Sequence, residues 1–165
     1  MDRYYYFIAE LPVLFFGKEP ALPMTWFVEE AEKCLTPLDY QQLQKIHYLS
    51  CEVRPDDPPI LQTYKQFEYE LRSDIAAWRH ARKQQQDYKP SAFPLTLVKE
   101  GDPLTVEKNL LLFRWRFLES LEPSHHFDFA FIIIYYLKLQ LLQKFFTFDK
   151  EIGKSKYKLY TITGL

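Results

Sequence analysis

Residues 60–86 read ILQTYKQFEYELRSDIAAWRHARKQQQ, and no glycine or proline interrupts them. Apolar side chains recur in this stretch at steps of three and four, which is the spacing of one face of an α-helix. At 1.5 Å per residue the helix would be about 40 Å long, enough to cross a small domain. The stretch therefore predicts one long helix with a continuous apolar stripe, formed by Leu61, Tyr64, Phe67, Leu71, Ile75 and Trp78.

The opposite face of this predicted helix changes charge along its length, from acidic to basic. This order complements the helix dipole and allows ion pairs at three and four residues. Two interpretations stay open, a solvated face with ion pairs or a surface that binds a partner. The acidic residues are Glu68, Glu70 and Asp74, and the basic ones are Arg79, Arg82 and Lys83.

Other segments predict further helices around this one. Thr25, Thr36 and Thr105 are suitable N-caps because a threonine hydroxyl can accept a hydrogen bond from a free backbone N–H. The last long helix is apolar almost all round, which places it in the centre of the core. The helices expected besides 60–86 cover 26–35, 36 to about 50, 106–121, and 126 to about 148.

The chain is therefore expected to be all-α, a bundle of about five helices with one long central helix and a short extended N-terminal segment at 11–16. The aromatic run at 4–12 should dock on the core, because an aromatic side chain gains roughly 1.5–3 kcal/mol on burial. Residues 1–148 are expected to form a single domain. Residues 149–165 form a lysine-rich tail, expected to be poorly ordered or to pack on something else, and a possible start of a further unit.

Composition excludes some function classes. The 165 residues carry 21 basic and 22 acidic side chains, so no overall positive field favours nucleic acid as a partner. Cys34 and Cys51 are the two cysteines, and no leader pattern opens the chain, which together favour a reducing cytoplasm. Charged and glutamine residues interrupt the apolar segment at 127–148, so a buried core helix is favoured over a membrane span.

No catalytic residue, metal ligand set or cofactor is predicted. Gly153-Lys154-Ser155 resembles the end of a phosphate-binding loop, but Phe148 stands where that motif requires glycine. His125, His126 and Asp128 are potential metal ligands, yet polar residues at the start of a helix explain them better. The repeated pattern FEYE at 67–70 and FTFD at 146–149 suggests a duplicated helical unit.

Three segments carry a family resemblance: YYYFIAELP at 4–12, the helical stretch 67–82, and LQKFFTFD at 142–149. They resemble an uncharacterised bacterial family encoded among genes for V-type (V/A-type) ATPase subunits, which is distantly similar to the V-type ATPase C subunit. That subunit is an all-helical, non-catalytic socket between the central rotor stalk and the membrane ring, and it repeats a helical unit with a segment similar to 74–79. Relatives in this family continue past a position like Phe148 with a second helical unit.

The resemblance implies a non-catalytic helical component or assembly factor of a V-type ATPase, and so a role in ion or proton transport. Its partners would be other ATPase subunits of the central stalk or membrane ring, and it would be cytoplasmic and peripheral to the inner membrane through them. The alternative is a small helical enzyme or ligand-binding domain with a tyrosine-lined pocket. The residues predict no particular oligomeric state. The expected partner interface consists of Arg79, Arg82, Lys83, Phe145, Phe146 and Phe148.

Overall fold

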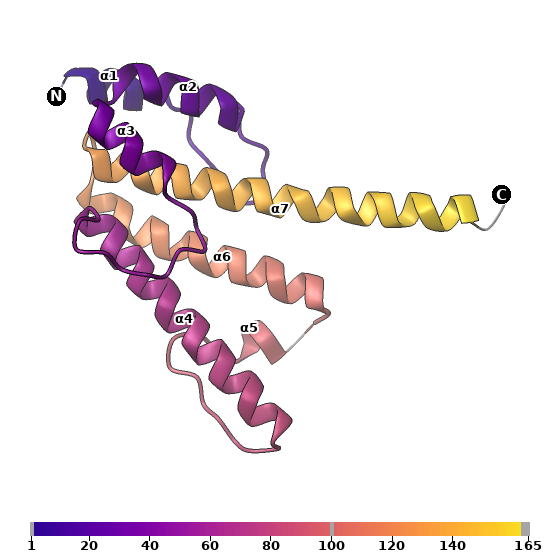
Figure 1. Cartoon of the computed structure of the whole chain (residues 1–165). Coiled ribbons are helices and arrows are strands. Elements are labelled where there is room, and N and C mark those ends of the chain that lie inside the picture. Colours follow the sequence, from indigo (N-terminus) through magenta and orange to yellow (C-terminus); the bar gives the residue numbers. More distant parts are fainter. Residues whose placement is uncertain (1, 100, 163–165) are drawn as a thin grey trace.

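The computed structural model describes the backbone of residues 2–99 and 101–162 and the side chains of 4–99 and 101–148. About two thirds of the chain is helical, and the described residues contain no strand. The all-α prediction is therefore confirmed (Figure 1). The elements are α1 Asp2–Glu10, α2 Met24–Cys34, α3 Pro37–Gln44, α4 Pro59–Lys83, α5 Thr96–Lys99, α6 Pro103–Leu121, the 3-10 turn η1 Glu122–Ser124, and α7 Phe129–Ile162.

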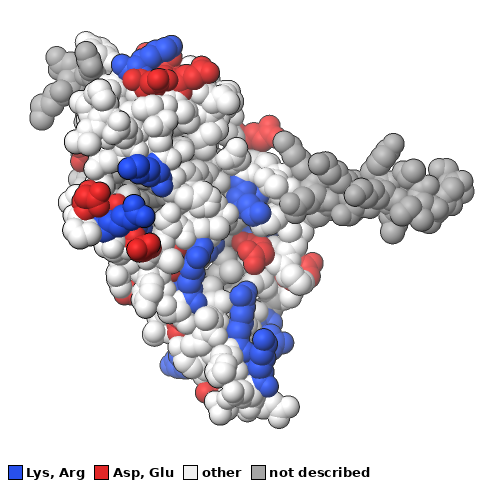
Figure 2. Space-filling view, viewed as in Figure 1, with Lys and Arg blue, Asp and Glu red and all other residues white. Residues whose placement is uncertain are grey.

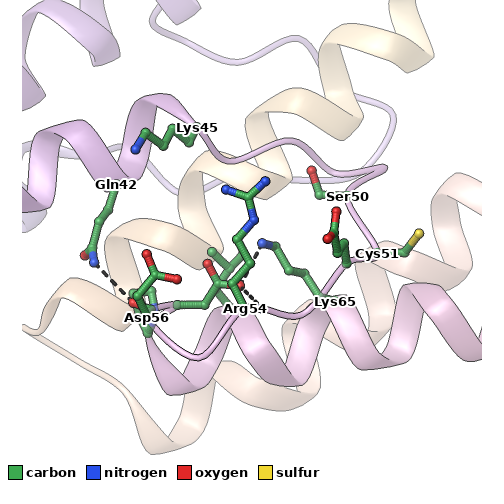
Figure 3. Close-up of a pocket in the computed structure, with 11 residues that line it drawn as sticks. Gln42, Lys45, Ser50, Cys51, Arg54, Asp56 and Lys65 are labelled. Atoms are coloured by element: carbon green, nitrogen blue, oxygen red, sulfur yellow. Dashed lines mark hydrogen bonds and ion pairs between the residues drawn. The ribbon is translucent and has the colours of Figure 1, made fainter.

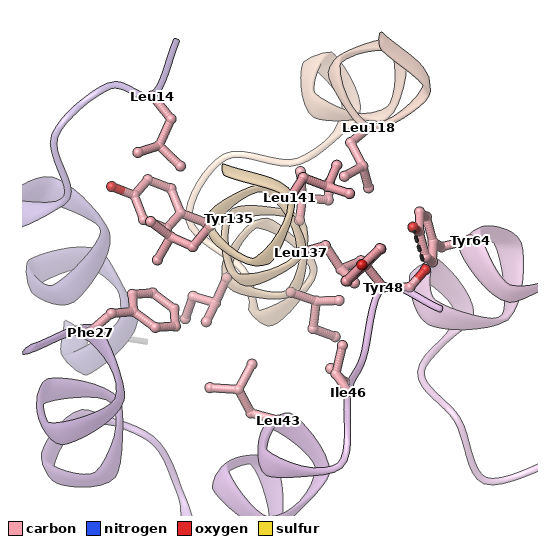
Figure 4. Packing of buried hydrophobic residues seen from close by; sticks show 14 of the residues in the cluster. Leu14, Phe27, Leu43, Ile46, Tyr48, Tyr64, Leu118, Tyr135, Leu137 and Leu141 are labelled. Carbon is pink, nitrogen blue, oxygen red and sulfur yellow. Dashed lines mark hydrogen bonds between the residues drawn. The ribbon is translucent and has the colours of Figure 1, made fainter. Parts of the chain in front are cut away.

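Helix α7 is the centre of the core, as its apolar sequence predicts. Helices α1, α4 and α6 all contact it. Figure 4 shows side chains arranged around its axis, with Phe27 of α2 on one side and Leu118 of α6 on another. Residues on every side of the helix between Ile132 and Leu142 are buried. The bundle therefore forms by wrapping shorter helices around one apolar helix.

The segment Phe129–Phe148 of α7 is also long and apolar enough to cross a membrane by length and composition alone. More than half of it is buried inside the protein. That burial agrees with the prediction of a core helix.

The aromatic N-terminal run docks on the core, but as a helix that the sequence patterns did not predict. Phe7 of α1 is 1% exposed and packs on Phe27 of α2, with ring centroids 5.5 Å apart. The extended piece is shorter than expected and covers residues 12–15. Leu14 from this piece is buried in the core.

Two of the three predicted caps are wrong. Thr36 caps α3 as expected, because its Oγ1 accepts a hydrogen bond from the Asp39 N–H at 3.2 Å. The N-cap of α2 is Pro23, one residue before Met24, so Thr25 lies inside the helix. The N-cap of α6 is Asp102, whose carboxylate accepts from the Thr105 N–H at 2.7 Å. The cap is Asp102 rather than Thr105 because the helix starts earlier, at Pro103. Proline has no backbone N–H, and the first helical position does not require one.

Helix α3 ends at Gln44 rather than near residue 50. The chain then leaves the helix so that Ile46 and Tyr48 insert into the core. Gln140 of α7 satisfies the backbone exposed by this break, because its Nε2 donates to the Ile46 carbonyl at 2.9 Å and its Oε1 accepts from the Tyr48 N–H at 2.8 Å. A single buried amide thus holds the α3–α4 connection against the central helix.

Helix α7 begins and ends later than expected. Asp128 precedes it, and its Oδ1 accepts from the Phe131 N–H at 3.0 Å. Asp128 Oδ2 lies 2.9 Å from His125 Nδ1, so these polar residues organise the helix start, as the sequence suggested. The backbone continues in helix through Ile162 instead of ending near 148. The tail side chains, including its lysines at 150, 154, 156 and 158, lie outside the described residues.

Candidate partner-binding surfaces

Two of the three predicted acids of α4 are buried, whereas the third, Glu70, is exposed as a solvated face requires. Glu68 is 0% exposed and Asp74 is 6% exposed. Arg114 of α6 forms two hydrogen bonds to the Glu68 carboxylate, from Nε at 2.8 Å and from Nη2 at 2.9 Å. Arg72, one turn along α4, adds a third bond from Nε at 3.0 Å. The predicted solvated face is therefore wrong at these two acids, because α6 and a loop cover them.

Asp74 fastens the chain that follows α4. Its carboxylate accepts hydrogen bonds from the Tyr88 hydroxyl and from the Ala92 N–H, the latter at 2.8 Å. The hydrogen bond to Asp74 raises the pKa of Tyr88. The connection from α4 to α5 is thus folded back along α4, which fixes its position beside the basic end of the helix.

The basic end of α4 is exposed, as the sequence predicted. Arg79, Arg82 and Lys83 are all exposed side chains. The Arg82 guanidinium lies over the Trp78 ring, 5.3 Å from its centroid. Figure 2 shows Lys and Arg side chains gathered on the lower part of the molecule, where the C-terminal half of α4 and α5 lie. This end of the molecule is a candidate binding surface, and Lys99 of α5 adds to it.

The three phenylalanines of the expected interface are less exposed than a binding surface requires. Phe148 is buried, and Phe145 and Phe146 are half-buried. Phe16 from the N-terminal segment packs on Phe145 at 5.0 Å between ring centroids, and Lys108 lies over the same ring at 5.1 Å. The expectation that Phe148 belongs to a partner interface is therefore not supported by its position, because Phe148 packs in the core cluster.

The expected interface residues do not form one site. Arg79, Arg82 and Lys83 lie at the C-terminal end of α4, whereas Phe145, Phe146 and Phe148 lie where α7 leaves the bundle. The two helices diverge toward these ends in Figure 1. The structure therefore offers two separate surfaces rather than a single interface.

A polar cavity of about 550 Å³ lies between α3, the loop before α4, and α4 (Figure 3). Lys65 donates to the Asp57 carboxylate at 2.8 Å, and the same carboxylate accepts from the Arg54 N–H at 2.9 Å. Figure 3 shows the Gln42 amide facing the backbone of Asp56, to which it donates at 3.4 Å. The Lys65–Asp57 ion pair and these backbone hydrogen bonds hold the loop against α3 and α4.

No metal site stands out in the described part of the chain. No group of three or more His, Cys, Asp or Glu side chains there could hold an ion. Cys34 and Cys51 are not joined in a disulfide. The residues at 153–155 that resemble a phosphate loop lie inside helix α7.

Several tyrosines act as structural anchors through their hydroxyl groups. The Tyr64 hydroxyl donates to the Tyr48 carbonyl at 2.8 Å, and the Tyr135 hydroxyl donates to the Pro12 carbonyl at 2.7 Å. Tyr4 donates in the same way to Asp39. Burial raises the pKa of Tyr64, and it raises the pKa of Tyr135 to about 12, so neither phenol loses its proton near neutral pH.

One cavity does have tyrosines in its wall. It has a volume of about 660 Å³, lies between α7 and the end of α3, and is lined in part by Tyr48 and Tyr136. The surrounding side chains are mainly amides, lysines and aliphatic groups, and His47 is the one imidazole. The His47 Nδ1 accepts from the Leu49 N–H at 3.1 Å, which commits one ring nitrogen to the loop.

The buried ion pair and the Asp74 anchor were missed by the sequence reasoning. Arg114 stands in the apolar run of 110–118, and a charge in such a run needs a partner when it is buried. Glu68 likewise stands between the stripe residues Phe67 and Leu71. These two positions were the available signal, although nothing local links residues 46 positions apart.

Residues 94–161 match a protein family that is described as a protein of unknown function (DUF2764). The match covers α5, α6 and most of α7. No curated protein and no solved structure gives a significant match to the chain.

Proposed function

We propose that this chain is a non-catalytic helical component or assembly factor of a V-type (V/A-type) ATPase, binding the central stalk or its assembly intermediates. The sequence resemblance supplies the identity of the partner. In this proposal the protein is cytoplasmic and reaches the inner membrane through the subunits that it binds.

The observation that supports a binding role best is the length of α7. The helix has 34 residues, and its C-terminal part extends beyond the other helices (Figure 1). An isolated helix shorter than about 12–15 residues is marginal in water, and most helices in proteins are stabilised by packing. A projecting helix is therefore well suited to pack on a second protein.

The tyrosine geometry supports the binding role over the enzyme alternative. The hydroxyls of Tyr4, Tyr64, Tyr88 and Tyr135 are committed to hydrogen bonds that hold the fold together. These four tyrosines thus have a structural role that requires no ligand.

The test is affinity purification of the tagged full-length chain from its native cell after mild crosslinking, with mass spectrometry of the captured proteins. Enrichment of V-type ATPase stalk or membrane-ring subunits, over an unrelated tagged helical protein, is the expected result. Equal recovery of those subunits with both baits would overturn the proposal.

A further inference from the structure

Cations along α4 differ in whether a carboxylate neutralises them. In the first part of the helix, Lys65 pairs with Asp57 at 2.8 Å and Arg72 pairs with Glu68 at 3.0 Å. In the last turns, Arg79, Arg82 and Lys83 form no ion pair with another described residue. The change from paired to unpaired cations occurs where the helix reaches the exposed end of the molecule.

Two hollows flank Trp78 at this end. One has a volume of about 280 Å³ and includes Arg82, Leu95 and Lys99 in its wall. The other has a volume of about 240 Å³ and includes Arg79, Val98 and Val106 in its wall, together with Arg82. Each hollow therefore combines apolar side chains with cations, and Trp78 and Arg82 line both of them. The acids among their described lining residues are Asp87 and Glu107.

The Arg82 side chain is held in place before any partner arrives. Its guanidinium lies over the Trp78 ring at 5.3 Å, and such contacts leave the N–H groups available around the edge of the plane. The Asp74 anchor fixes the loop that forms the opposite wall, through Tyr88 and Ala92. Preorganised cations lose less conformational entropy on binding than mobile ones.

We propose that the two hollows around Trp78 bind an acidic amphipathic segment of a partner protein, with apolar side chains in the hollows and carboxylates on Arg79, Arg82 and Lys99. This inference rests on the proposed function in that the partner is a protein, and it adds the chemistry of the segment that is bound.

A protein segment fits this end better than the other polyanions do. A nucleic acid is held mainly by many phosphate contacts, and the chain as a whole has a formal charge of −1. A membrane surface would favour apolar side chains that protrude, whereas Leu95, Val98 and Val106 are partly or fully buried in the walls of concave hollows. An acidic amphipathic helix offers carboxylates and apolar side chains at matching spacing.

The test uses the full-length chain and a fluorescent peptide of Glu, Leu and Ala, about 15 residues long so that a helix can form. Fluorescence anisotropy measures binding of this peptide and of an analogue in which glutamine replaces each glutamate. The test variant is Arg79→Gln/Arg82→Gln. The control Lys45→Gln/Arg54→Gln removes the same charge at the polar cavity near the other end of α4, where Lys65, the lining residue furthest along α4, lies about 21 Å from Arg79 by helix rise.

We expect the acidic peptide to bind and the glutamine analogue not to bind. Arg79→Gln/Arg82→Gln should weaken binding by about tenfold or more, because two charge-assisted hydrogen bonds are lost. The control variant should bind as the unmodified protein does, and circular dichroism should show equal helix content in all three. Added salt should weaken binding, since the pairs lie at the surface.

Equal weakening by both variants would overturn the inference, because it would show a non-specific charge effect. The inference would also fail if oligodeoxythymidine, or vesicles of phosphatidylcholine and phosphatidylserine, bound more tightly than the peptide and lost binding in Arg79→Gln/Arg82→Gln. If the peptide binds but no ATPase subunit is captured from cells, the proposed function fails and this inference stands. If the Arg79→Gln/Arg82→Gln protein captures ATPase subunits and binds the peptide as well as the unmodified protein does, the inference fails and the proposed function stands.

Discussion

Glu68 on α4 and Arg114 on α6 form a two-armed ion pair in the interior, with N–O distances of 2.8 and 2.9 Å. A planar guanidinium can donate two parallel hydrogen bonds to a carboxylate only when the two groups lie within a narrow range of orientations. Burial alone would lower the pKa of Arg114, but the hydrogen bonds and charge of Glu68 outweigh that effect and raise it. Arg114 therefore stays charged, and its two hydrogen bonds to Glu68 set the register of α4 against α6.

Removing one member of this pair should strongly destabilise the protein. Arg114→Met leaves the Glu68 carboxylate buried with Arg72 as its one remaining cation, and breaking a buried pair in this way costs about 3–5 kcal/mol. Urea denaturation followed by circular dichroism measures the free energy of unfolding.

The exposed Arg116 on the same helix provides the control for that measurement. Arg116→Met should change the free energy of unfolding by less than about 0.5 kcal/mol. The double variant Glu68→Met/Arg114→Met should recover most of the loss, because no uncompensated charge is left. A loss in Arg114→Met no larger than in Arg116→Met would show that the pair does not stabilise the fold.

Sequence periodicity was sufficient for the long elements. The one-sided stripe from Leu61 to Trp78 and the apolar run in α7 predict helices that the structure contains, with α7 as the centre. These long segments repeat the same spacing many times, so one residue that departs from the pattern does not change the prediction of a helix. The boundaries were less accurate, because a side-chain cap depends on a single residue, as Asp102 shows at the start of α6.

Short or continuous patterns were not sufficient. Helix α1 was missed because the consecutive aromatics at 4–7 show no helical spacing, and α5 was missed because it has four residues between Pro94 and Gly101. The buried states of Glu68 and Asp74 depend on groups from α6 and from the loop at 84–95, which local spacing does not reveal. The exposure of Arg79, Arg82 and Lys83 was predictable because these three cations lie on one helix, whereas the contribution of Lys99 and the hollows beside Trp78 depends on other elements.

The Asp102 cap should make the stability of α6 depend on pH. The hydrogen bond from the Thr105 N–H lowers the pKa of Asp102. A lowered pKa in the folded state stabilises the protein above the unfolded-state pKa of about 3.9, and this stabilisation is lost as the pH falls below that value. Asp102→Asn keeps an oxygen acceptor but cannot ionise.

The unmodified protein should therefore be more stable than Asp102→Asn near neutral pH, and the two should converge on acidification. Denaturant unfolding at a series of pH values gives the difference. Asp102→Ala, which has no acceptor, should be less stable than Asp102→Asn throughout the series. A difference between the protein and Asp102→Asn that stays constant with pH would contradict the charged cap.

The purified protein should not bind ATP through the segment that resembles a phosphate loop. Residues 153–155 lie within α7, where backbone N–H groups bond to carbonyls four residues earlier and are not free to surround a phosphate. Isothermal titration calorimetry with MgATP should give no binding heat. Micromolar binding that Lys154→Ala abolishes would show that this segment does form a nucleotide site.

Phe67 and Phe146 occupy corresponding places in the repeated aromatic pattern, and their packing predicts different roles. The Phe67 ring stacks on Phe117 of α6, with centroids 3.9 Å apart and an angle of 5° between the planes. It also lies 5.6 Å from the ring of Phe113. Phe146 has one such neighbour, Phe145, at 5.2 Å. Both rings are half-buried, so the number of ring contacts distinguishes them.

Phe67→Ala should therefore cost about 3 kcal/mol of unfolding free energy, near the low end for loss of a packed phenylalanine. Phe146→Ala should cost about 1 kcal/mol, since only part of its apolar surface is removed from water. If the start of the projecting part of α7 contacts the ATPase partner, Phe146→Ala should also reduce the recovery of ATPase subunits in affinity purification. Thermal melts and the purification together decide the matter. Equal, large losses of stability in the two variants would indicate two equivalent core anchors in a duplicated unit. A large loss confined to Phe67→Ala, together with weaker association in Phe146→Ala, would assign Phe146 to a binding surface.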